Sequence, residues 1–422
     1  MSKATIEPAE GASLRQRIGR WQPALKSRQY RNYWLFSITS LSGQQVVVIA
    51  QAWLIFDLTD SALYLALLGL STAVPGIAFS LFGGVLADRL DVRRLLSSTQ
   101  LFMTGIALVL MTLTATGLIE PWQVLICAFL TGAGQAFNNP ARQAIYPQLV
   151  PRDDLSSAVN LNSMAWQTTR ILAPAAGGAL IAVAGVSAAF FACAAGYLPF
   201  ALFVRTLKVE RVPARGLKLR DAIIEGPRYV LSNPLFTALI GLTFFNSFFG
   251  TGLFQIFPMI AKEVLDVGPS GLGLMYSAMG VGSLSGLFVA SLFGGNPRKG
   301  QMILVCAAIY GFVILFFAVA TVFWAALIAL FLMGGTSQCY MVMVQTALQM
   351  EVPDQLRGRV MGIYTMTYNM GPLGAAQSGG LAALFNPATA LAVGGLCIVA
   401  LALYLAVPNA GLRSLRSAPE PA

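Results

Sequence analysis

Residues 301–320 have the sequence QMILVCAAIYGFVILFFAVA, an unbroken apolar run without a charged side chain. A helix of about 20 such residues crosses the roughly 30 Å hydrocarbon core of a membrane. The strands of a membrane β-barrel alternate apolar and polar residues, and this run does not alternate. The stretch therefore predicts a transmembrane α-helix.

The rest of the chain has the same character. Of its 422 residues, 56% are hydrophobic and 10% are charged, and the mean hydropathy is +0.70. A soluble domain carries about 25% charged residues. We therefore expect an all-α polytopic membrane protein with 12 transmembrane helices in two six-helix bundles. The apolar runs place the helices at 32–57, 62–87, 95–117, 122–139, 155–183, 186–204, 235–260, 271–293, 301–320, 322–345, 360–384 and 388–407.

The positive charges indicate the orientation. If the N-terminus is cytoplasmic, all but two of the 27 Lys and Arg residues, including Arg142, fall in cytoplasmic segments. Lys262 falls in an outer loop, and Arg170 alone lies within a span. Cytoplasmic loops of membrane proteins retain positive charge, so we expect both termini in the cytoplasm. The net charge of +10 then reflects topology and attraction to anionic lipid, without a nucleic-acid partner.

Several kinds of chemistry are excluded. The chain has no histidine, and its five cysteines stand apart from one another in the sequence, which argues against a metal site or a redox motif. The phosphate-binding pattern G-x-x-x-x-G-K-[ST] of ATP-driven pumps is absent. We expect a protein that is not an enzyme and that uses no cofactor, and any coupled proton should bind a carboxylate.

The two halves of the chain repeat. A basic segment at residues 205–234 separates six spans from six, and SLFGG occurs at 80–84 and again at 291–295. Such repeats are typical of two-bundle transporters. The expected parts are a basic arm (1–31), a first bundle (32–204), a cytoplasmic linker (205–234), a second bundle (235–407) and a cytoplasmic tail (408–422).

The loop from Gly84 to Arg94, GVLADRLDVRR, resembles the signature G-x-x-x-D-R-x-G-R-[KR]-[KR] of the major facilitator superfamily. Asp91 stands where that pattern has glycine, and Val92 where it has a basic residue. The resemblance extends from about Arg28 to Val407. It implies a transporter with the major facilitator fold.

This loop is expected to form a cytoplasmic gate. A glycine at position 84 lets helices approach closely. Asp88 at a helix end can meet Arg359 or the positive N-terminus of the eleventh span, at 360–384. The alternative is a simple cluster of charges that sets topology. The residues assigned to the gate are Gly84, Asp88, Arg89, Arg93, Arg94 and Arg359.

A second resemblance is more local. Residues 138–178, NNPARQAIYPQLVPRDDLSSAVNLNSMAWQTTRILAPAAGG, are similar to bacterial exporters of the enterobactin-exporter type, a branch that includes siderophore and macrolide exporters. The segments 27–31 and 53–59 share this similarity. It implies a secondary active exporter in the bacterial inner membrane that works by alternating access and usually exchanges its substrate for protons.

The fifth span carries a proline-glycine stretch that resembles the one in superfamily exporters. Pro174 removes a backbone donor and is expected to bend the helix, while Gly177 and Gly178 permit close packing. Pro372 is its counterpart in the second half. An ordinary kinked helix is the alternative.

Polar residues in the spans predict a substrate cavity. Asn160, Gln167, Arg170 and Pro174 share one face of the fifth span. Arg170 lies about 22 Å into that helix at roughly 1.5 Å per residue, where an arginine costs at least about 2.5 kcal/mol unless a cavity or partner satisfies it. We expect it to meet an anionic group of the substrate; a structural arginine bonded to helix carbonyls is the alternative.

Further polar and aromatic residues are assigned to the same amphipathic, aromatic-walled cavity. Taken singly, each suits a bond between helices as well as a ligand contact. The additional cavity residues are Gln44, Gln51, Gln135, Asn246, Gln338, Tyr364 and Tyr368.

For proton coupling, the candidates are the acids that directly continue a span, Asp57 and Asp88, with Asp57 first. A plain helix-end role is the alternative for Asp57. The expected function is secondary active export of a small amphipathic, siderophore-like or drug-like molecule by a monomer, with protons and membrane lipids as further partners. The rival functions are lipid or lysophospholipid flipping, a channel and a receptor.

Overall fold

The computed structural model describes residues 23–89, 91–207, 228–292, 299–368 and 370–406. Every regular element in these ranges is a helix, and no strand occurs among them. A chain in lipid must bond its backbone amides and carbonyls internally, and a helix does so within one segment. The expected all-α fold is confirmed.

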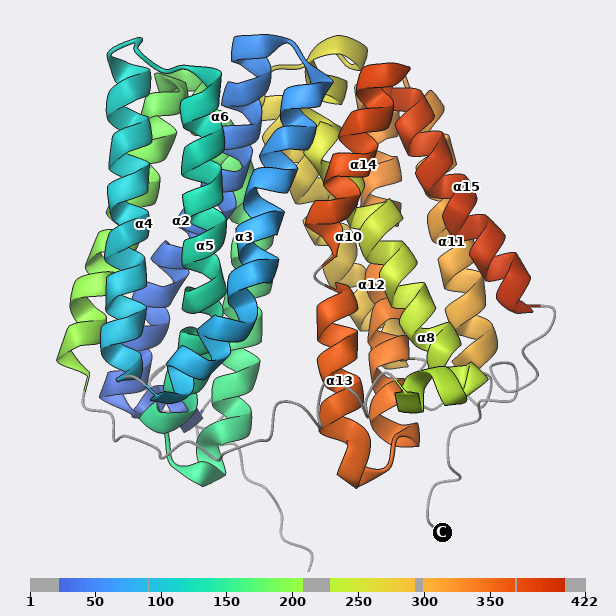
Figure 1. The fold of residues 1–422 in the computed structure, drawn as a ribbon, viewed down its shortest axis with the longest axis horizontal. Helices are drawn as coiled ribbons and strands as arrows, with labels where there is room; N and C mark the ends of the chain where they lie inside the picture. The colour runs from blue at the N-terminus through green and yellow to red at the C-terminus, as the bar shows by residue number, and fades with distance from the viewer. Residues whose placement is uncertain (1–22, 90, 208–227, 293–298, 369, 407–422) are drawn as a thin grey trace, which may run out of the picture.

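The N-terminal bundle (blue to green in Figure 1) is built from five long helical elements. They are α2 (Arg28–Thr59), α3 (Ala62–Arg89), α4 (Val92–Ala115), α5 (Pro121–Ile145) and α6 (Leu155–Thr206), with short 3-10 turns η1 (Pro23–Lys26), η2 (Tyr146–Leu149) and η3 (Arg152–Asp154). The element α6 comprises two helices that meet at Gly185, whose φ of 83° only glycine adopts readily. This bundle therefore has six spans.

The C-terminal bundle follows the linker. Its first span changes helix type four times, through α8 (Pro234–Phe245), η4 (Asn246–Gly250, a π-helix), η5 (Thr251–Ile256, 3-10), α9 (Phe257–Met259) and η6 (Ile260–Val264, π). The other spans are α10 (Pro269–Leu292), α11 (Lys299–Val319), α12 (Phe323–Glu351), the pair α13 (Asp354–Tyr368) and α14 (Gly371–Leu384), and α15 (Pro387–Ala406). Among the described residues, nine stretches are long and apolar enough to cross a membrane; the division of α6, together with α5 and the α13–α14 pair, gives twelve spans.

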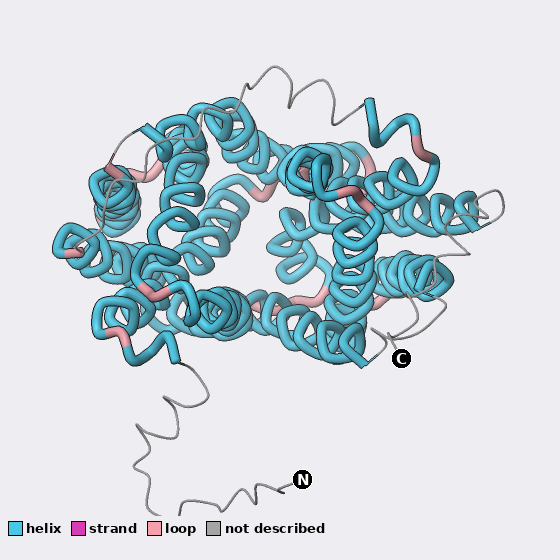
Figure 2. The backbone as a smooth tube through the Cα atoms, turned by 90° about the horizontal axis from the view of Figure 1, so that it is seen from below, coloured by secondary structure: helices cyan, strands magenta, loops and turns pink. Residues whose placement is uncertain are grey.

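The bundles meet on one side. We call the side on which α2 begins and α15 ends the terminal side, and the opposite side the far side (Figure 1). Helix α6 packs on α10 and α3 packs on α14 between the bundles. Figure 1 shows α5 and α13 apart on the terminal side, and Figure 2 shows the two groups of helices side by side from that direction.

Glycines bring the α6 and α10 backbones together. A Cβ at Gly178 would lie 2.3 Å from the carbonyl oxygen of Pro269, and one at Gly273 would lie 2.6 Å from that of Pro174. The Ser277 hydroxyl also donates a hydrogen bond to the carbonyl of Ile171, 2.5 Å away. The two bundles thus touch backbone to backbone here.

The prolines behave differently from one another. Helix α6 keeps helical backbone angles through Pro174 and departs from them at Gly185. Pro372 lies in the first turn of α14, after the chain has left α13. The bend expected at Pro372 therefore falls between α13 and α14, just before the proline. Residues that precede a proline disfavour helical backbone angles.

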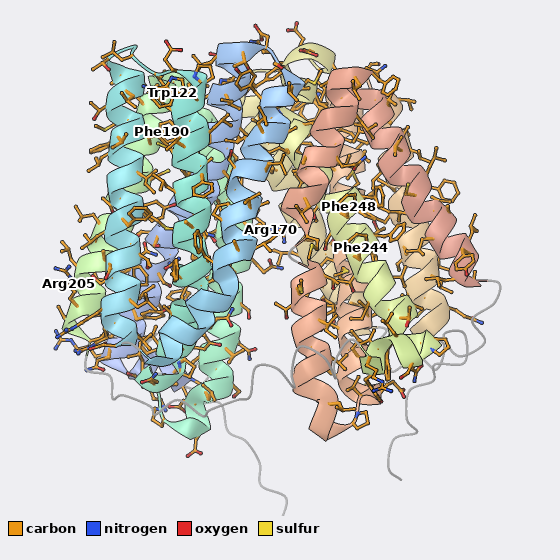
Figure 3. All side chains as sticks on the ribbon, in the orientation of Figure 1. Trp122, Arg170, Phe190, Arg205, Phe244 and Phe248 are labelled. Atoms are coloured by element: carbon orange, nitrogen blue, oxygen red, sulfur yellow. The ribbon has the colours of Figure 1, made fainter. Side chains whose placement is uncertain are left out.

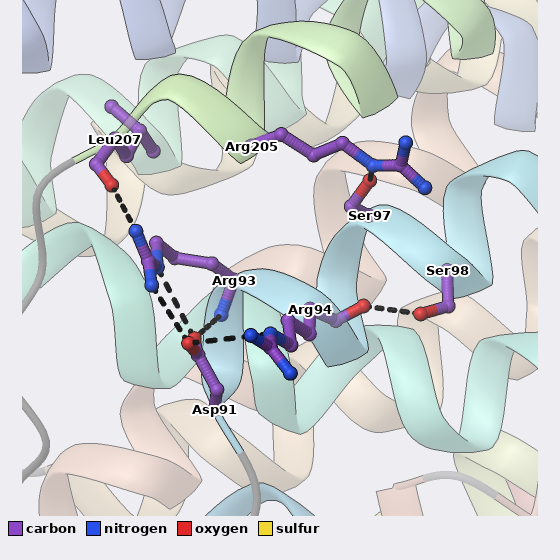
Figure 4. A network of polar contacts seen from close by, with 7 residues as sticks. All are labelled: Asp91, Arg93, Arg94, Ser97, Ser98, Arg205 and Leu207. Atoms are coloured by element: carbon purple, nitrogen blue, oxygen red, sulfur yellow. Dashed lines mark hydrogen bonds and ion pairs between the residues drawn. The ribbon is translucent and has the colours of Figure 1, made fainter.

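Asp91 organises the start of α4 (Figure 4). Its carboxylate caps α4 by accepting a bond from the Arg93 amide at 3.0 Å, and it pairs with the Arg93 guanidinium at 2.8 Å. Arg93 also donates to the carbonyl of Leu207, and Arg205 donates to the Ser97 hydroxyl, each at 2.9 Å. These contacts tie the start of α4 to the end of α6.

We predict that Gly178→Ala destabilises the protein. The added methyl group has no room against Pro269, and overpacking typically costs about 1–3 kcal/mol. Gly105→Ala is the matched control, because nothing lies within 4 Å of a Cβ there and alanine favours a helix by roughly 0.5–1 kcal/mol. Thermal unfolding in detergent should give a lower midpoint for the first variant only; equal midpoints would contradict the close contact.

A second prediction concerns Asp91. Arg93 holds the pKa of Asp91 below its ordinary value, so the pair stabilises the fold above the ordinary carboxyl value of about 4 and this stabilisation is lost as the pH falls below it. Asp91→Asn keeps a capping side chain and should cost about 1 kcal/mol or less near neutral pH. Asp91→Ala also loses the cap and should cost about 1 kcal/mol more.

The measurement is the unfolding midpoint of both variants between pH 7 and pH 3. The gap between wild type and Asp91→Asn should close at the acid end. Asp153→Asn, at an exposed acid in η3, is the control and should leave the midpoint unchanged. A difference in midpoint that persists at acid pH would show that the Asp91–Arg93 ion pair does not stabilise the start of α4.

Candidate functional site

A cavity of about 270 Å³ lies within the C-terminal bundle and opens toward α6. Its lining combines polar, aromatic and methionine side chains from seven elements. The lining residues are Arg170, Asn246, Thr251, Phe254, Met279, Ser283, Tyr310, Met333, Gly334, Ser337, Gln338, Met341, Val342, Gln345 and Tyr364.

Arg170 is the one contribution of the N-terminal bundle to this lining. Figure 3 shows it at mid-height between the bundles. Its side chain is partly buried, and no hydrogen bond or ion pair joins its guanidinium to the described part of the chain. Because an arginine stays charged in proteins, the cavity faces a cation that no carboxylate pairs with in the described part of the chain.

Asn246 enters the cavity where α8 becomes a π-helix. Its amide nitrogen donates to the Ser337 hydroxyl of α12 at 2.8 Å, and the residue is buried. Irregular backbone at membrane depth is tolerated where it lines a cavity, and π-turns are frequent at functional sites. The π-turn therefore places a fixed polar group beside the cavity.

The remaining walls are adaptable. Met279, Met333 and Met341 line the cavity together with Phe254 and Tyr310. Methionine side chains are flexible and polarisable, and surfaces rich in them accept varied apolar partners. The arrangement can therefore hold an amphipathic molecule, with its apolar part on the methionines and its polar part at Arg170.

Of the residues assigned to the cavity from the sequence, the structure brings together Arg170, Asn246, Gln338 and Tyr364. The others whose side chains are described lie elsewhere. Gln51 is buried with its amide nitrogen unbonded, Gln135 accepts a weak bond from Asn138 at 3.4 Å, Asn160 is exposed, and Gln44 and Gln167 are partly buried outside the lining. Tyr368 lies outside the described side chains.

Sequence reasoning missed several lining residues. One side of α12 contributes a lining residue about every four positions, at Met333, Ser337, Met341 and Gln345, next to Gln338. This spacing was a usable signal. Tyr310 gave none, because it is a lone tyrosine within the most apolar run of the chain. Its position depends on how α11 packs.

An ion-pair cluster joins the bundles on the far side. The Lys262 ammonium lies 2.7 Å from a carboxylate oxygen of Asp60 and 3.5 Å from one of Asp57. Lys262 belongs to the π-turn η6, where the sequence analysis expected an outer loop. We call these three residues the far-side clamp. Asp57, the first candidate for proton coupling, is thus paired with a cation of the other bundle.

The expected cytoplasmic gate is described only in part. Arg93 and Arg94 both contact Asp91, at 2.8 Å and 4.0 Å. The surroundings of Gly84, Asp88, Arg89 and Arg359 lie outside what the structure describes. A latch between Asp88 and Arg359 therefore stays a prediction.

Arg142 lies in a different place from the one that the sequence predicts. Arg142 was counted with a cytoplasmic loop, but it lies in the last turn of α5 and is 4% exposed. Its guanidinium donates to the Ser40 hydroxyl at 2.9 Å and lies 4.6 Å from the centre of the Phe200 ring. The helix continues past the predicted end at residue 139 because these polar side chains bond inside the bundle.

The described residues contain no group of three or more His, Cys, Asp or Glu that could hold a metal ion. The sulfurs of Cys306 and Cys339 lie 3.9 Å apart across α11 and α12. This contact was not predictable from the sequence, because the two cysteines are 33 residues apart.

Similar proteins are bacterial exporters. The chain is 27% identical over 365 residues to the enterobactin exporter EntS of Salmonella typhimurium, covering 83% of this chain and 86% of that protein. It is 27% identical over 370 residues to the enterobactin exporter EntS of Citrobacter koseri, covering 83% and 85%.

Solved structures show the same fold. A bacterial homologue of the human lysosomal transporter Spinster, in an inward-facing and unoccupied conformation, aligns with a TM-score of 0.67 at 19% identity, covering 93% of this chain and 99% of that one. The nucleoside transporter NupG aligns with a TM-score of 0.67 at 12% identity, covering 90% and 98%. A family model described as transmembrane secretion effector matches residues 18–419. The chain therefore belongs to this family of major facilitator superfamily transporters.

Proposed function

We propose that this transporter exports a small amphipathic molecule that carries an anionic group, by alternating access. The observation that carries the proposal is the unpaired guanidinium of Arg170, which faces a cavity otherwise lined by methionines, aromatic rings and neutral polar groups. A planar guanidinium binds a carboxylate or catecholate through two parallel hydrogen bonds. The similarity to enterobactin exporters supports a siderophore-like substrate.

The position of Arg170 suits alternating access. The residue comes from α6, while the rest of the lining comes from the C-terminal bundle. A substrate held between them would bridge the two bundles, so its binding would depend on their relative position. A ligand shifts such an equilibrium only by its different affinity for the two states.

We place the terminal side in the cytoplasm, following the positive charges of the sequence. The bundles touch on the far side through α6, α10, α3 and α14, so the described arrangement corresponds to an inward-facing state of a bacterial inner-membrane protein. Export then requires the far-side contacts to open. The far-side clamp supplies the ion pairs among those contacts.

Protons are proposed as the counter-ion, with Asp57 as their first site. Protonation of Asp57 would weaken its attraction to Lys262 and favour opening on the far side. An exposed ion pair contributes about 0.2–1 kcal/mol, and Asp57 is 54% exposed. A change of this size moves a two-state equilibrium by up to about fivefold.

We predict that Arg170→Ala lowers affinity for an anionic amphiphile by about 10- to 100-fold, because a hydrogen bond to a charged group is worth about 1.5–3 kcal/mol. Arg170→Lys keeps the charge without the planar fork and should fall between alanine and wild type. Affinity is measured by titration of the purified protein with a catecholate siderophore fragment, a cationic amphiphile and an anionic lysophospholipid.

Arg205→Lys is the matched control, because Arg205 lies on the outer face of the N-terminal bundle (Figure 3). It should bind all three probes as wild type does. Preference for the lysophospholipid over the catecholate would favour lipid flipping. Unchanged anion affinity in folded Arg170→Ala, or unfolding of both Arg170 variants, would make Arg170 structural and refute its role as the substrate's partner.

We also predict that Asp57→Asn reduces the dependence of transport on a proton gradient, measured as substrate flux in proteoliposomes over a range of pH. Lys262→Met shows how Asp57 acts. If Asp57 works by holding Lys262, both variants should reduce the dependence alike, whereas a proton carrier independent of the clamp would leave Lys262→Met coupled. Asp153→Asn on the terminal side should behave as wild type, and normal coupling in Asp57→Asn would exclude the assignment.

A further inference from the structure

Arg142 is an incompletely bonded cation inside the N-terminal bundle. Its guanidinium makes one hydrogen bond, from Nη2 to the Ser40 hydroxyl at 2.9 Å. Its Nε and Nη1 atoms are sealed from solvent and have no hydrogen-bond partner. Arginine remains protonated in proteins, so a full positive charge is enclosed here.

The polar side chains beyond the Ser40 hydroxyl are already bonded to one another. Ser40 donates onward to Gln100 at 3.0 Å, and the Gln100 amide donates to Asn138 at 2.9 Å. The Phe200 ring, 4.6 Å from the guanidinium carbon, offers a cation–π contact. These contacts fix the guanidinium in place and leave its Nε and Nη1 atoms without a hydrogen-bond partner.

Two hydroxyl groups near the guanidinium are also unsatisfied. The phenol oxygen of Tyr33 lies within side-chain hydrogen-bonding range of the Arg142 guanidinium, and that of Tyr197 interacts electrostatically with the same charge; both hydroxyls are sealed from solvent without a well-formed hydrogen bond. Four buried polar atoms without a well-formed hydrogen bond, Nε and Nη1 of Arg142 and the two phenol oxygens, thus belong to one electrostatically coupled group, and each of them can donate a proton. They come from α2, α5 and α6.

No carboxylate neutralises this charge in the described part of the bundle. The acids there stand at helix ends, and none forms an ion pair with Arg142. These acids are Asp57, Asp60, Asp91, Glu120, Asp153 and Asp154. A buried charge requires a partner, because removing it from water is costly.

We propose that this place binds a small inorganic anion of halide size, with chloride as the abundant representative. The anion would accept bonds from Arg142 Nε and Nη1 and from the hydroxyls of Tyr33 and Tyr197. A water molecule could accept some of these bonds but would leave the charge unbalanced. The bound anion would join α2, α5 and α6 and stabilise the N-terminal bundle independently of substrate.

The test uses the full-length protein in detergent. Its thermal unfolding midpoint is measured in sodium chloride, sodium bromide and sodium gluconate at equal ionic strength. Because a ligand that binds only the folded state raises stability with its concentration, chloride and bromide should raise the midpoint in a saturable way. Gluconate is too large for an enclosed site and should not.

The variants separate a specific site from a general salt effect. Arg142→Gln should abolish the difference between chloride and gluconate, while Arg228→Gln, at an exposed arginine that precedes α8, should retain it. Tyr33→Phe and Tyr197→Phe each remove one hydroxyl and should raise the half-saturating chloride concentration several-fold; they decide the question if Arg142→Gln does not fold. Equal midpoints in chloride and gluconate, or unchanged halide dependence in the folded variants, would overturn the proposal.

Discussion

In lipid, every backbone amide and carbonyl must find its hydrogen-bond partner within its own segment, and the rest of this structure depends on that constraint. It explains why the described spans from α2 to α15 are helical, and why irregular backbone in the middle of a span lies against other parts of the protein. Pro174 has no amide proton to offer the carbonyl of Arg170, and α10 packs against this same stretch, with a Cβ at Gly280 only 3.3 Å from that carbonyl. The π-turn at Asn246 likewise lines the cavity.

The fold follows closely from the apolar runs, because hydrophobic length alone determines which segments cross a membrane. The boundary after Gly185 was predictable too, since two apolar runs meet there. The end of α5 was not. Asn138, Pro140 and Arg142 have the composition of a loop, yet Asn138 and Arg142 lie buried and bonded to Gln100 and Ser40. Polarity along a sequence does not show whether a side chain meets water or another polar side chain.

The candidate site was harder to predict, and Arg170 and Gln51 illustrate why. Both are polar residues in apolar spans, and a helical pattern gives the face on which each lies. It does not give the neighbour of that face. Arg170 reaches a cavity built almost entirely by the other bundle, whereas Gln51 is buried outside the lining of that cavity. Arg170 could be singled out because a charge at membrane depth demands a partner; neutral amides carry no such demand.

The glycine contacts between α6 and α10 have a mechanical consequence. Gly178 and Gly273 bring the α6 and α10 backbones into direct contact, and a Cβ at Gly280 would lie against Ile171 of α6, so few side chains at these positions would have to disengage when the bundles rotate. Helices in such an interface can shift relative to each other with little side-chain rearrangement, whereas a larger side chain at one of these glycines would not fit. The polar contacts between the bundles include the ion pairs of Lys262 and the hydrogen bond from the Ser277 hydroxyl to the carbonyl of Ile171. The close backbone contacts of α6 and α10 therefore limit how the bundles can move, whereas the ion pairs of Lys262 must break for the far side to open.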